Sequence, residues 1–130
     1  MTLPASAKPA VLERNELLRD VMDRIGDKWS VIVICRLDGG PLRFNALRRA
    51  ADGITQRMLS ATVRRLERDG LISRTVEATV PPSVEYALTE RGRSLHAVLA
   101  ELVAWTEANL DDIRRGREEY DAASVWRAPQ

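Results

Sequence analysis

Residues 54–71, ITQRMLSATVRRLERDGL, constrain the fold most, because their apolar and cationic residues recur with the period of an α-helix. Leu59, Val63 and Leu66 follow one another at intervals of four and three, so they share one helix face. The opposite face carries Arg57, Ala61, Arg64 and Arg68. This pattern predicts an amphipathic helix with its apolar face toward a core and its arginines toward solvent or a polyanion.

The same segment carries a start signal and a stop signal. Thr55 can cap the first turn, since its hydroxyl accepts a hydrogen bond from an amide that has no partner within the helix, and Gly70 is typical of a helix end. The predicted helix therefore covers residues 55–69. Taken alone, its arginines are equally consistent with a DNA-recognition helix and with an ordinary solvated helix face.

The neighbouring segments favour the DNA-recognition interpretation. After Gly70, LISRTVEA and VEYAL flank the sequence VPPS at 80–83, which predicts a β-hairpin with its prolines at the tip. Before it, residues 39–51 predict a companion helix, joined through the short turn DGIT. Helix, turn, helix and hairpin in this order predict a winged helix-turn-helix, mainly α with a small β-hairpin, in the α+β class.

Charge is distributed unevenly along the 130 residues, although the formal net charge is only +1. Residues 41–75 hold eight arginines against three acidic residues, a local charge of +5. Residues 101–121 hold seven acidic residues against three arginines, a local charge of −4. A basic surface confined to one region is what binding to a DNA groove requires.

Three further helices are predicted, over residues 11–25, 28–37 and 89–113, the last capped by Thr89. The first and last carry apolar faces with two alternative roles: they close the core of a monomer, or they pack against a second copy in a twofold homodimer. The residues expected at a dimer interface are Leu18, Val21, Met22, Leu99, Leu102 and Trp105. We expect a single domain with its core at about 11–112, and with 1–10 and 113–130 flexible or peripheral.

Several function classes lack their sequence signals. The first residues do not resemble a secretion signal, no run approaches the ~20 apolar residues of a membrane span, and one cysteine is consistent with a reducing cytoplasm. The chain has no glycine-rich phosphate loop, no H-E-x-x-H and no G-x-S-x-G, and its single histidine has no metal-ligand spacing around it. We therefore expect a cytoplasmic protein that is not an enzyme and binds no cofactor or metal.

Four segments together resemble the HxlR-type bacterial transcriptional regulators, relatives of the MarR winged-helix group. They are IGDKW at 25–29, GPLRFNAL at 40–47, GITQRMLSATVRRLERDGLISR at 53–74 and VPPSVEYALTERGRSL at 80–95. The resemblance covers about residues 15–106. It implies a cytoplasmic, homodimeric DNA-binding protein that controls a nearby gene, commonly as a repressor. It also implies that helix 55–69 enters the major groove and that hairpin 71–88 contacts the DNA backbone or minor groove.

Groove chemistry divides the candidate DNA contacts into two sets. Arginine can fork hydrogen bonds to guanine, glutamine can bond adenine, and a small residue can approach a thymine methyl group. The base-contacting set is Gln56, Arg57, Ser60, Ala61 and Arg64. The set expected at the DNA backbone is Arg43, Arg48, Thr55, Arg65, Arg68 and Arg74. The expected DNA partner is a double-stranded, palindromic operator.

The chain departs from the resemblance at two positions. Several family members sense oxidants through a cysteine about fourteen residues before the tryptophan of the KW pair, and that position here is Asn15, which cannot form a thiolate. Cys35 lies in an apolar segment and is expected to be a packed side chain rather than a sensor. Ser83 stands where relatives often have a basic wing residue.

Three questions stay open at this point. The same helix and hairpin could bind a protein instead of DNA, which makes a protein-interaction module without specific DNA binding the alternative function. A small-molecule effector could bind in a dimer cleft, but no residue identifies it. Trp126 lies beyond the resemblance and has no assigned role.

Overall fold

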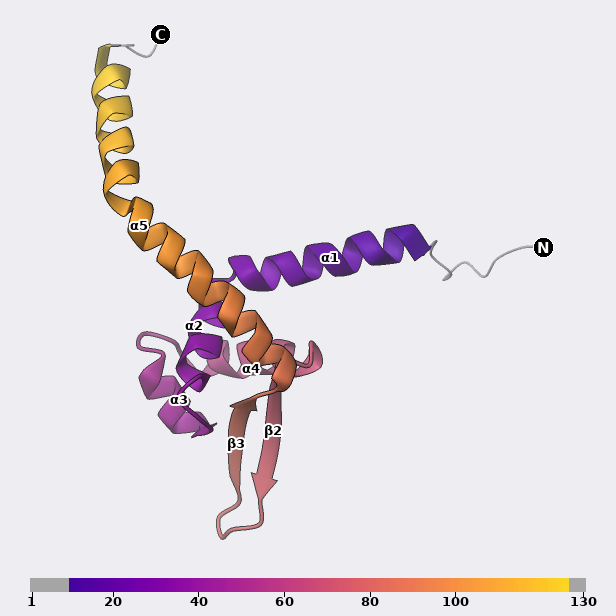
Figure 1. Ribbon diagram of the computed structural model, residues 1–130. Helices are drawn as coiled ribbons and strands as arrows, with labels where there is room; N and C mark the ends of the chain where they lie inside the picture. Colours follow the sequence, from indigo (N-terminus) through magenta and orange to yellow (C-terminus); the bar gives the residue numbers. More distant parts are fainter. Residues whose placement is uncertain (1–9, 127–130) are drawn as a thin grey trace, which may run out of the picture. The chain divides into compact units, whose positions relative to one another are not determined.

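Residues 10–126, the part of the chain that the computed structural model describes, form five helices and three short strands. In chain order (Figure 1) the elements are α1 (Ala10–Gly26), α2 (Lys28–Leu37), β1 (Leu42–Arg43), α3 (Phe44–Ala50), α4 (Gln56–Arg68), β2 (Ile72–Glu77), β3 (Ser83–Leu88) and α5 (Glu90–Trp126). This confirms the predicted class, mainly helical with a small antiparallel sheet. The described residues divide into two compact units, with the division between His96 and Ala97.

The sheet of the first unit has three antiparallel strands in the order β1-β3-β2. β2 and β3 form the predicted hairpin, with register from Ile72 opposite Leu88 to Glu77 opposite Ser83. Figure 1 shows this hairpin, the wing, projecting beyond α3 and α4. β1 was not predicted, because a two-residue strand directly after Pro41 is too short to show alternation. β1 pairs with β3 through Leu42 opposite Tyr86, which joins the helix-turn-helix to the wing.

The core of this unit collects apolar side chains from α2, α3, α4 and the sheet. The most deeply buried of these side chains are Val33, Ile34, Leu37, Leu47, Leu59, Leu66 and Ile72. The apolar run predicted to form a buried helix is α2, whose N-cap is Asp27: its carboxylate accepts a hydrogen bond from the backbone N–H of Trp29 at 3.4 Å. This core holds α4 by one face and leaves the other exposed.

The turn between α3 and α4 contains Gly53, whose φ of +93° lies in the left-handed region that glycine adopts without strain. α4 then begins where predicted, because the Thr55 hydroxyl accepts a hydrogen bond from the Met58 N–H at 3.1 Å. Gly70, with a φ of +74°, follows the end of α4 as predicted. Both boundaries of the predicted recognition helix are therefore confirmed to within one residue.

The start of α5 is fixed to the base of the wing. The Thr89 hydroxyl accepts a hydrogen bond from the Gly92 N–H at 3.1 Å, which confirms the predicted cap, and donates one to the Gly70 carbonyl oxygen at 2.6 Å. The Thr89 N–H also donates to the Leu71 carbonyl oxygen at 3.1 Å. These bonds tie the first turn of α5 to the residues that precede β2.

The second unit is the remainder of α5, which continues to Trp126 instead of ending near residue 113. Residues 113–126 are therefore helical, where the sequence analysis expected a flexible or peripheral tail. Ion pairs one turn apart support this part of the helix, between Arg114 and Asp111 at 3.5 Å and between Arg115 and Asp112 at 3.7 Å. Across residues 10–126, no helix combines the length and the apolar character that crossing a membrane requires.

Candidate nucleic-acid interface

α4 presents two distinct faces. Leu59, Val63 and Leu66 are buried as predicted, and Thr62 joins them at 1% exposure, which the apolar pattern did not reveal. The opposite face is exposed at Gln56, Arg57, Ala61, Arg64 and Arg68. α4 therefore offers a polar, cationic surface whose orientation is fixed from behind by packing.

The five residues predicted to contact bases lie together. Gln56, Arg57, Ser60, Ala61 and Arg64 line one open, shallow hollow on the exposed side of α4. Ser60 is half-buried and the other four are exposed. Ala61 carries no side chain beyond Cβ, so the surface is lowest at this residue. The guanidinium groups of Arg57 and Arg64 and the carboxamide of Gln56 surround it. A base edge in a groove could approach the helix backbone at that point.

A second hollow connects α4 with the wing. Ser60, Arg64 and Glu67 of α4 line it together with Arg74 of β2 and Tyr86 of β3. Arg74 is exposed and is directly opposite the buried Tyr86 in the strand register. The structure thus brings Arg74, predicted as a backbone contact, next to Arg64 of the base-contacting set, although ten residues separate them in sequence.

The other predicted backbone contacts lie around α3 and β1. Arg48 is exposed and lines a hollow that also includes Asn45, Arg49 and Asp52. Asn45 and Arg49 were not among the predicted contacts, although Arg49 belongs to the same basic run. Arg43 is exposed on β1, where its Nη2 lies 3.5 Å from Glu77 Oε2 in the wing. A phosphate that binds Arg43 would have to compete with this carboxylate.

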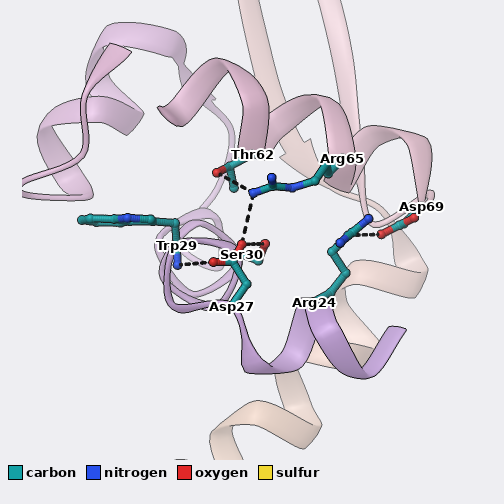
Figure 2. Close-up of polar contacts among 7 residues, drawn as sticks. All are labelled: Arg24, Asp27, Trp29, Ser30, Thr62, Arg65 and Asp69. Atoms are coloured by element: carbon teal, nitrogen blue, oxygen red, sulfur yellow. Dashed lines mark hydrogen bonds and ion pairs between the residues drawn. The ribbon is translucent and has the colours of Figure 1, made fainter. Parts of the chain in front are cut away.

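Arg65 does not occupy the position expected of a phosphate contact. Its Nη2 lies 3.2 Å from Asp27 Oδ2 and 3.4 Å from Thr62 Oγ1 (Figure 2). This places its guanidinium over the junction of α1 and α2 rather than beside Arg64 and Arg68. Sequence spacing placed Arg65 in the cationic run, but it could not show that Asp27, 38 residues away, would form an ion pair with it. A phosphate contact at Arg65 stays a prediction, and we do not include it in the phosphate set that we propose.

The residues expected at a dimer interface divide into two groups. Leu18, Val21 and Met22 on α1, and Leu102 and Trp105 on α5, are exposed in the single chain. Leu99 is only 2% exposed, so it has no surface to offer a partner, and we remove it from that set. Further exposed apolar side chains that the prediction omitted are Leu17, Val98, Val103, Leu110 and Tyr120.

Cys35 is half-buried in α2. Burial raises the pKa of its thiol, Asp38 raises it further, and Arg36 opposes them. A raised pKa lowers the thiolate fraction at neutral pH, so the environment of Cys35 disfavours nucleophilic chemistry. Within residues 10–126 no three His, Cys, Asp or Glu side chains are grouped as a metal site would require. The side chain of Trp126 lies outside the described residues.

Comparison with known proteins adds independent evidence. Residues 24–114 match the family described as HxlR-like helix-turn-helix. An HTH-type transcriptional regulator of Methanothermobacter thermautotrophicus is 49% identical over 84 residues, which cover 65% of this chain and 64% of that protein, just under two thirds of its length. The HTH-type transcriptional regulator YybR of Bacillus subtilis is 46% identical over 90 residues, covering 69% of this chain and 72% of the relative.

Solved structures agree with these relatives. The transcriptional regulator ytfH from Salmonella typhimurium superposes with a TM-score of 0.69 at 36% identity, covering 77% of this chain and 89% of that chain. The redox regulator HypR in its reduced form also gives 0.69, at 42% identity, with 75% and 97% covered. These relatives are regulators and not enzymes. The chain belongs to the HxlR-like helix-turn-helix family of DNA-binding transcriptional regulators.

Proposed function

We propose that this protein is a sequence-specific DNA-binding regulator, a dimeric repressor of a nearby gene, with α4 in the major groove and the wing against the DNA backbone. The observation that carries the proposal is the hollow on α4 lined by Gln56, Arg57, Ser60, Ala61 and Arg64. A major groove admits one helix, and side chains of these types can bond base edges from it. Their common hollow supports their action as one surface.

Phosphate contacts would surround this surface. Arg68 lies one turn beyond Arg64, Arg74 lies on the wing, and Arg48 lies on α3. Such contacts supply affinity and register, whereas the α4 side chains supply sequence preference. Thr55 and Arg43 complete the proposed backbone set. For Arg43 we expect binding only as its pair with Glu77 opens.

We further propose that two copies assemble through the exposed apolar side chains of α1 and α5, represented by Leu18, Val21, Met22, Leu102 and Trp105. Several large apolar side chains exposed on one helix are unfavourable in water, and a twofold pairing would bury them. A twofold dimer presents two α4 helices, so its operator would be palindromic. We place the protein in the cytoplasm, where its DNA is.

Control of binding is a separate part of the proposal. HypR, a structural relative, is described as a redox regulator. Here Asn15 has no thiol, and the half-buried Cys35 has a raised pKa, so we do not propose a thiol switch for this chain. If an effector acts, we propose a small molecule that binds the two states of the dimer with different affinity.

Fluorescence anisotropy tests the central proposal. The protein is titrated into labelled duplex from upstream of its own gene and into a scrambled duplex, over a series of salt concentrations. We expect tighter binding to the native duplex and a steep decrease in affinity with salt, because bound cations release counterions from phosphate. Equal, weak binding to both duplexes would contradict sequence-specific recognition and favour the alternative, a winged-helix module that binds a protein.

Arg57→Ala tests the assignment of base contacts. We expect it to weaken binding to the preferred duplex by about 1–3 kcal/mol and to affect the scrambled duplex far less. Arg68→Ala is the matched control on the same helix, and as a phosphate contact it should weaken both duplexes in similar proportion. Proportional loss on both duplexes with Arg57→Ala would show that Arg57 contacts phosphate instead.

A further inference from the structure

Two ion pairs join the α1–α2 junction to the end of α4, and their residues lie side by side in Figure 2. Arg24 Nε of α1 lies 2.8 Å from Asp69 Oδ2, the C-cap residue of α4. Asp27 Oδ2, at the N-cap of α2, lies 3.2 Å from Arg65 Nη2. The first pair is the more shielded from water, with side chains 19% and 28% exposed. Shielding from water strengthens such a pair and makes the loss of one partner more costly.

The order of the charges in these pairs matters. Arg24 and Asp27 lie about one turn apart in sequence, as do Arg65 and Asp69, and the two segments meet in antiparallel order. Each side carries one cation and one anion. If α4 moved by one turn along the junction, a shift in one direction would bring Arg65 opposite Arg24, and a shift in the other would bring Asp69 opposite Asp27. Either contact is between like charges, so this order of charges favours the observed register over both adjacent ones.

Both partners of the second pair make a further hydrogen bond to a buried side chain. Asp27 Oδ2 also accepts a hydrogen bond from Ser30 Oγ at 2.7 Å, and Ser30 is fully buried in α2. Arg65 bonds to the hydroxyl of Thr62, which is buried under α4. A bond between two side chains that are already ordered costs little further entropy. The pair can therefore transmit a displacement of α2 to α4.

We propose that Arg24 and Asp27 are positioning residues that set the register of α4 against the α1–α2 junction, and through it the spacing of the two α4 helices in a dimer. The inference rests on the proposed function. The exposed apolar residues of α1, Leu18, Val21 and Met22, lie on the same helix as Arg24. A dimer that forms through α1 would therefore orient each α4 through these ion pairs. Neither Arg24 nor Asp27 contacts DNA in this proposal, and both act through α4.

Operator spacing is a readout that general loss of stability does not change. A preferred duplex is selected from a random library with the wild-type protein, and its half-sites are then moved one base pair closer or farther apart. We expect Arg24→Gln and Arg65→Gln to reduce the preference for the selected spacing at least about fivefold. The charge exchange Arg24→Glu with Asp69→Arg re-forms the first pair but sets two anions opposite two cations, so it should restore the preference only in part. Arg19→Gln, at an exposed position of α1, is the matched control and should leave the preference unchanged.

A DNA-free measurement separates this inference from the proposed function. Spin labels are attached to cysteines introduced by Asp20→Cys in α1 and Ala61→Cys in α4, with Cys35→Ser to remove the native thiol. The labelled protein is diluted with unlabelled protein, so that only distances within one chain are measured. Pulsed electron–electron double resonance then gives the distance between the two helices. We expect one narrow distance distribution, which Arg24→Glu broadens or shifts and which the charge exchange narrows again only in part. If the wild type selects no DNA sequence, the proposed function fails and the label distances alone decide. Unchanged distances, or unchanged spacing preference in both single variants, would overturn the register assignment.

Discussion

Gly92 provides the sharpest stability test, because the first turn of α5 packs directly on the base of the wing. A Cβ added at Gly92 would overlap the carbonyl oxygen of Leu71 and would lie 3.0 Å from its carbonyl carbon and 3.2 Å from Leu88 Cδ2. The main obstruction is backbone, so a change of rotamer cannot relieve it. The same carbonyl oxygen already accepts the Thr89 N–H at 3.1 Å. A methyl group can therefore enter only if α5 and β2 move apart.

The magnitude follows from two opposing effects. Alanine is favoured over glycine within a helix by up to about 1 kcal/mol. Insertion of a methyl group into a closely packed site costs about 1–3 kcal/mol, and occasionally more. Since the obstruction is a fixed carbonyl group, we expect the upper part of that range for Gly92→Ala, a net destabilisation of about 1–2 kcal/mol. With a urea slope of about 1–3 kcal/mol per molar, the unfolding midpoint should fall by about 1 M.

Gly116 is the matched control, because it lies in the same helix and a Cβ there meets no atom within 4 Å. Gly116→Ala should raise the free energy of unfolding by up to about 1 kcal/mol. Urea unfolding followed by circular dichroism, at one fixed protein concentration, measures both variants, since dimerisation would make the midpoint depend on concentration. A Gly92→Ala protein as stable as the wild type would refute the close packing of α5 on Leu71.

Three further predictions concern the wing, the dimer and the thiol. Glu77→Gln should tighten DNA binding about two- to fivefold at low salt, because it frees Arg43 and removes a negative charge. Fluorescence anisotropy measures the affinity, with Glu118→Gln as the control, and an unchanged affinity of Glu77→Gln would refute the prediction. Met22→Asp should raise the dimer dissociation constant at least about tenfold by sedimentation, and an unaffected dimer would remove α1 from the interface. Cys35, with its raised pKa, should react with a disulfide reagent more slowly in the native than in the urea-unfolded chain, and both rates should increase with pH. Equal rates in the native and the unfolded chain would contradict the burial of Cys35.

Local signals in the sequence were sufficient for most of the helix-turn-helix and its wing. Thr55 and Gly70 mark the ends of α4 because capping and left-handed turns depend on single residues, and the prolines at 81 and 82 mark the hairpin tip. The five side chains that line the α4 hollow were predictable because helical period alone places them on one face. β1 was not predictable, since two residues form a strand there only because β3 lies beside them.

Arg65 shows where sequence reasoning on this surface ends. On the helix, Arg64 and Arg65 are adjacent, and both belong to the same basic run. What distinguishes them is the neighbour that tertiary structure brings to each one: Arg64 shares the hollow between α4 and the wing with Arg74, whereas Arg65 meets Asp27 from the α1–α2 junction. Neither neighbour of this kind follows from helical period, since each depends on how the chain folds back over α4.

Because Arg64 and Arg65 have different neighbours, substitutions on the two sides of α4 should have different effects on DNA binding. Substitutions at Arg57 or Arg64 alter what α4 contacts, so they should change which DNA sequence is preferred. Substitutions at Arg24, Asp27 or Arg65 alter how α4 is held, so they should change the tolerated half-site spacing and leave the preferred half-site as it was. One selection of duplexes from a random library, carried out with Arg57→Ala and with Arg65→Gln, measures both properties at once. If Arg65→Gln changed the half-site sequence and kept the spacing, Arg65 would have to contact DNA after all, and the ion pair with Asp27 would open on binding.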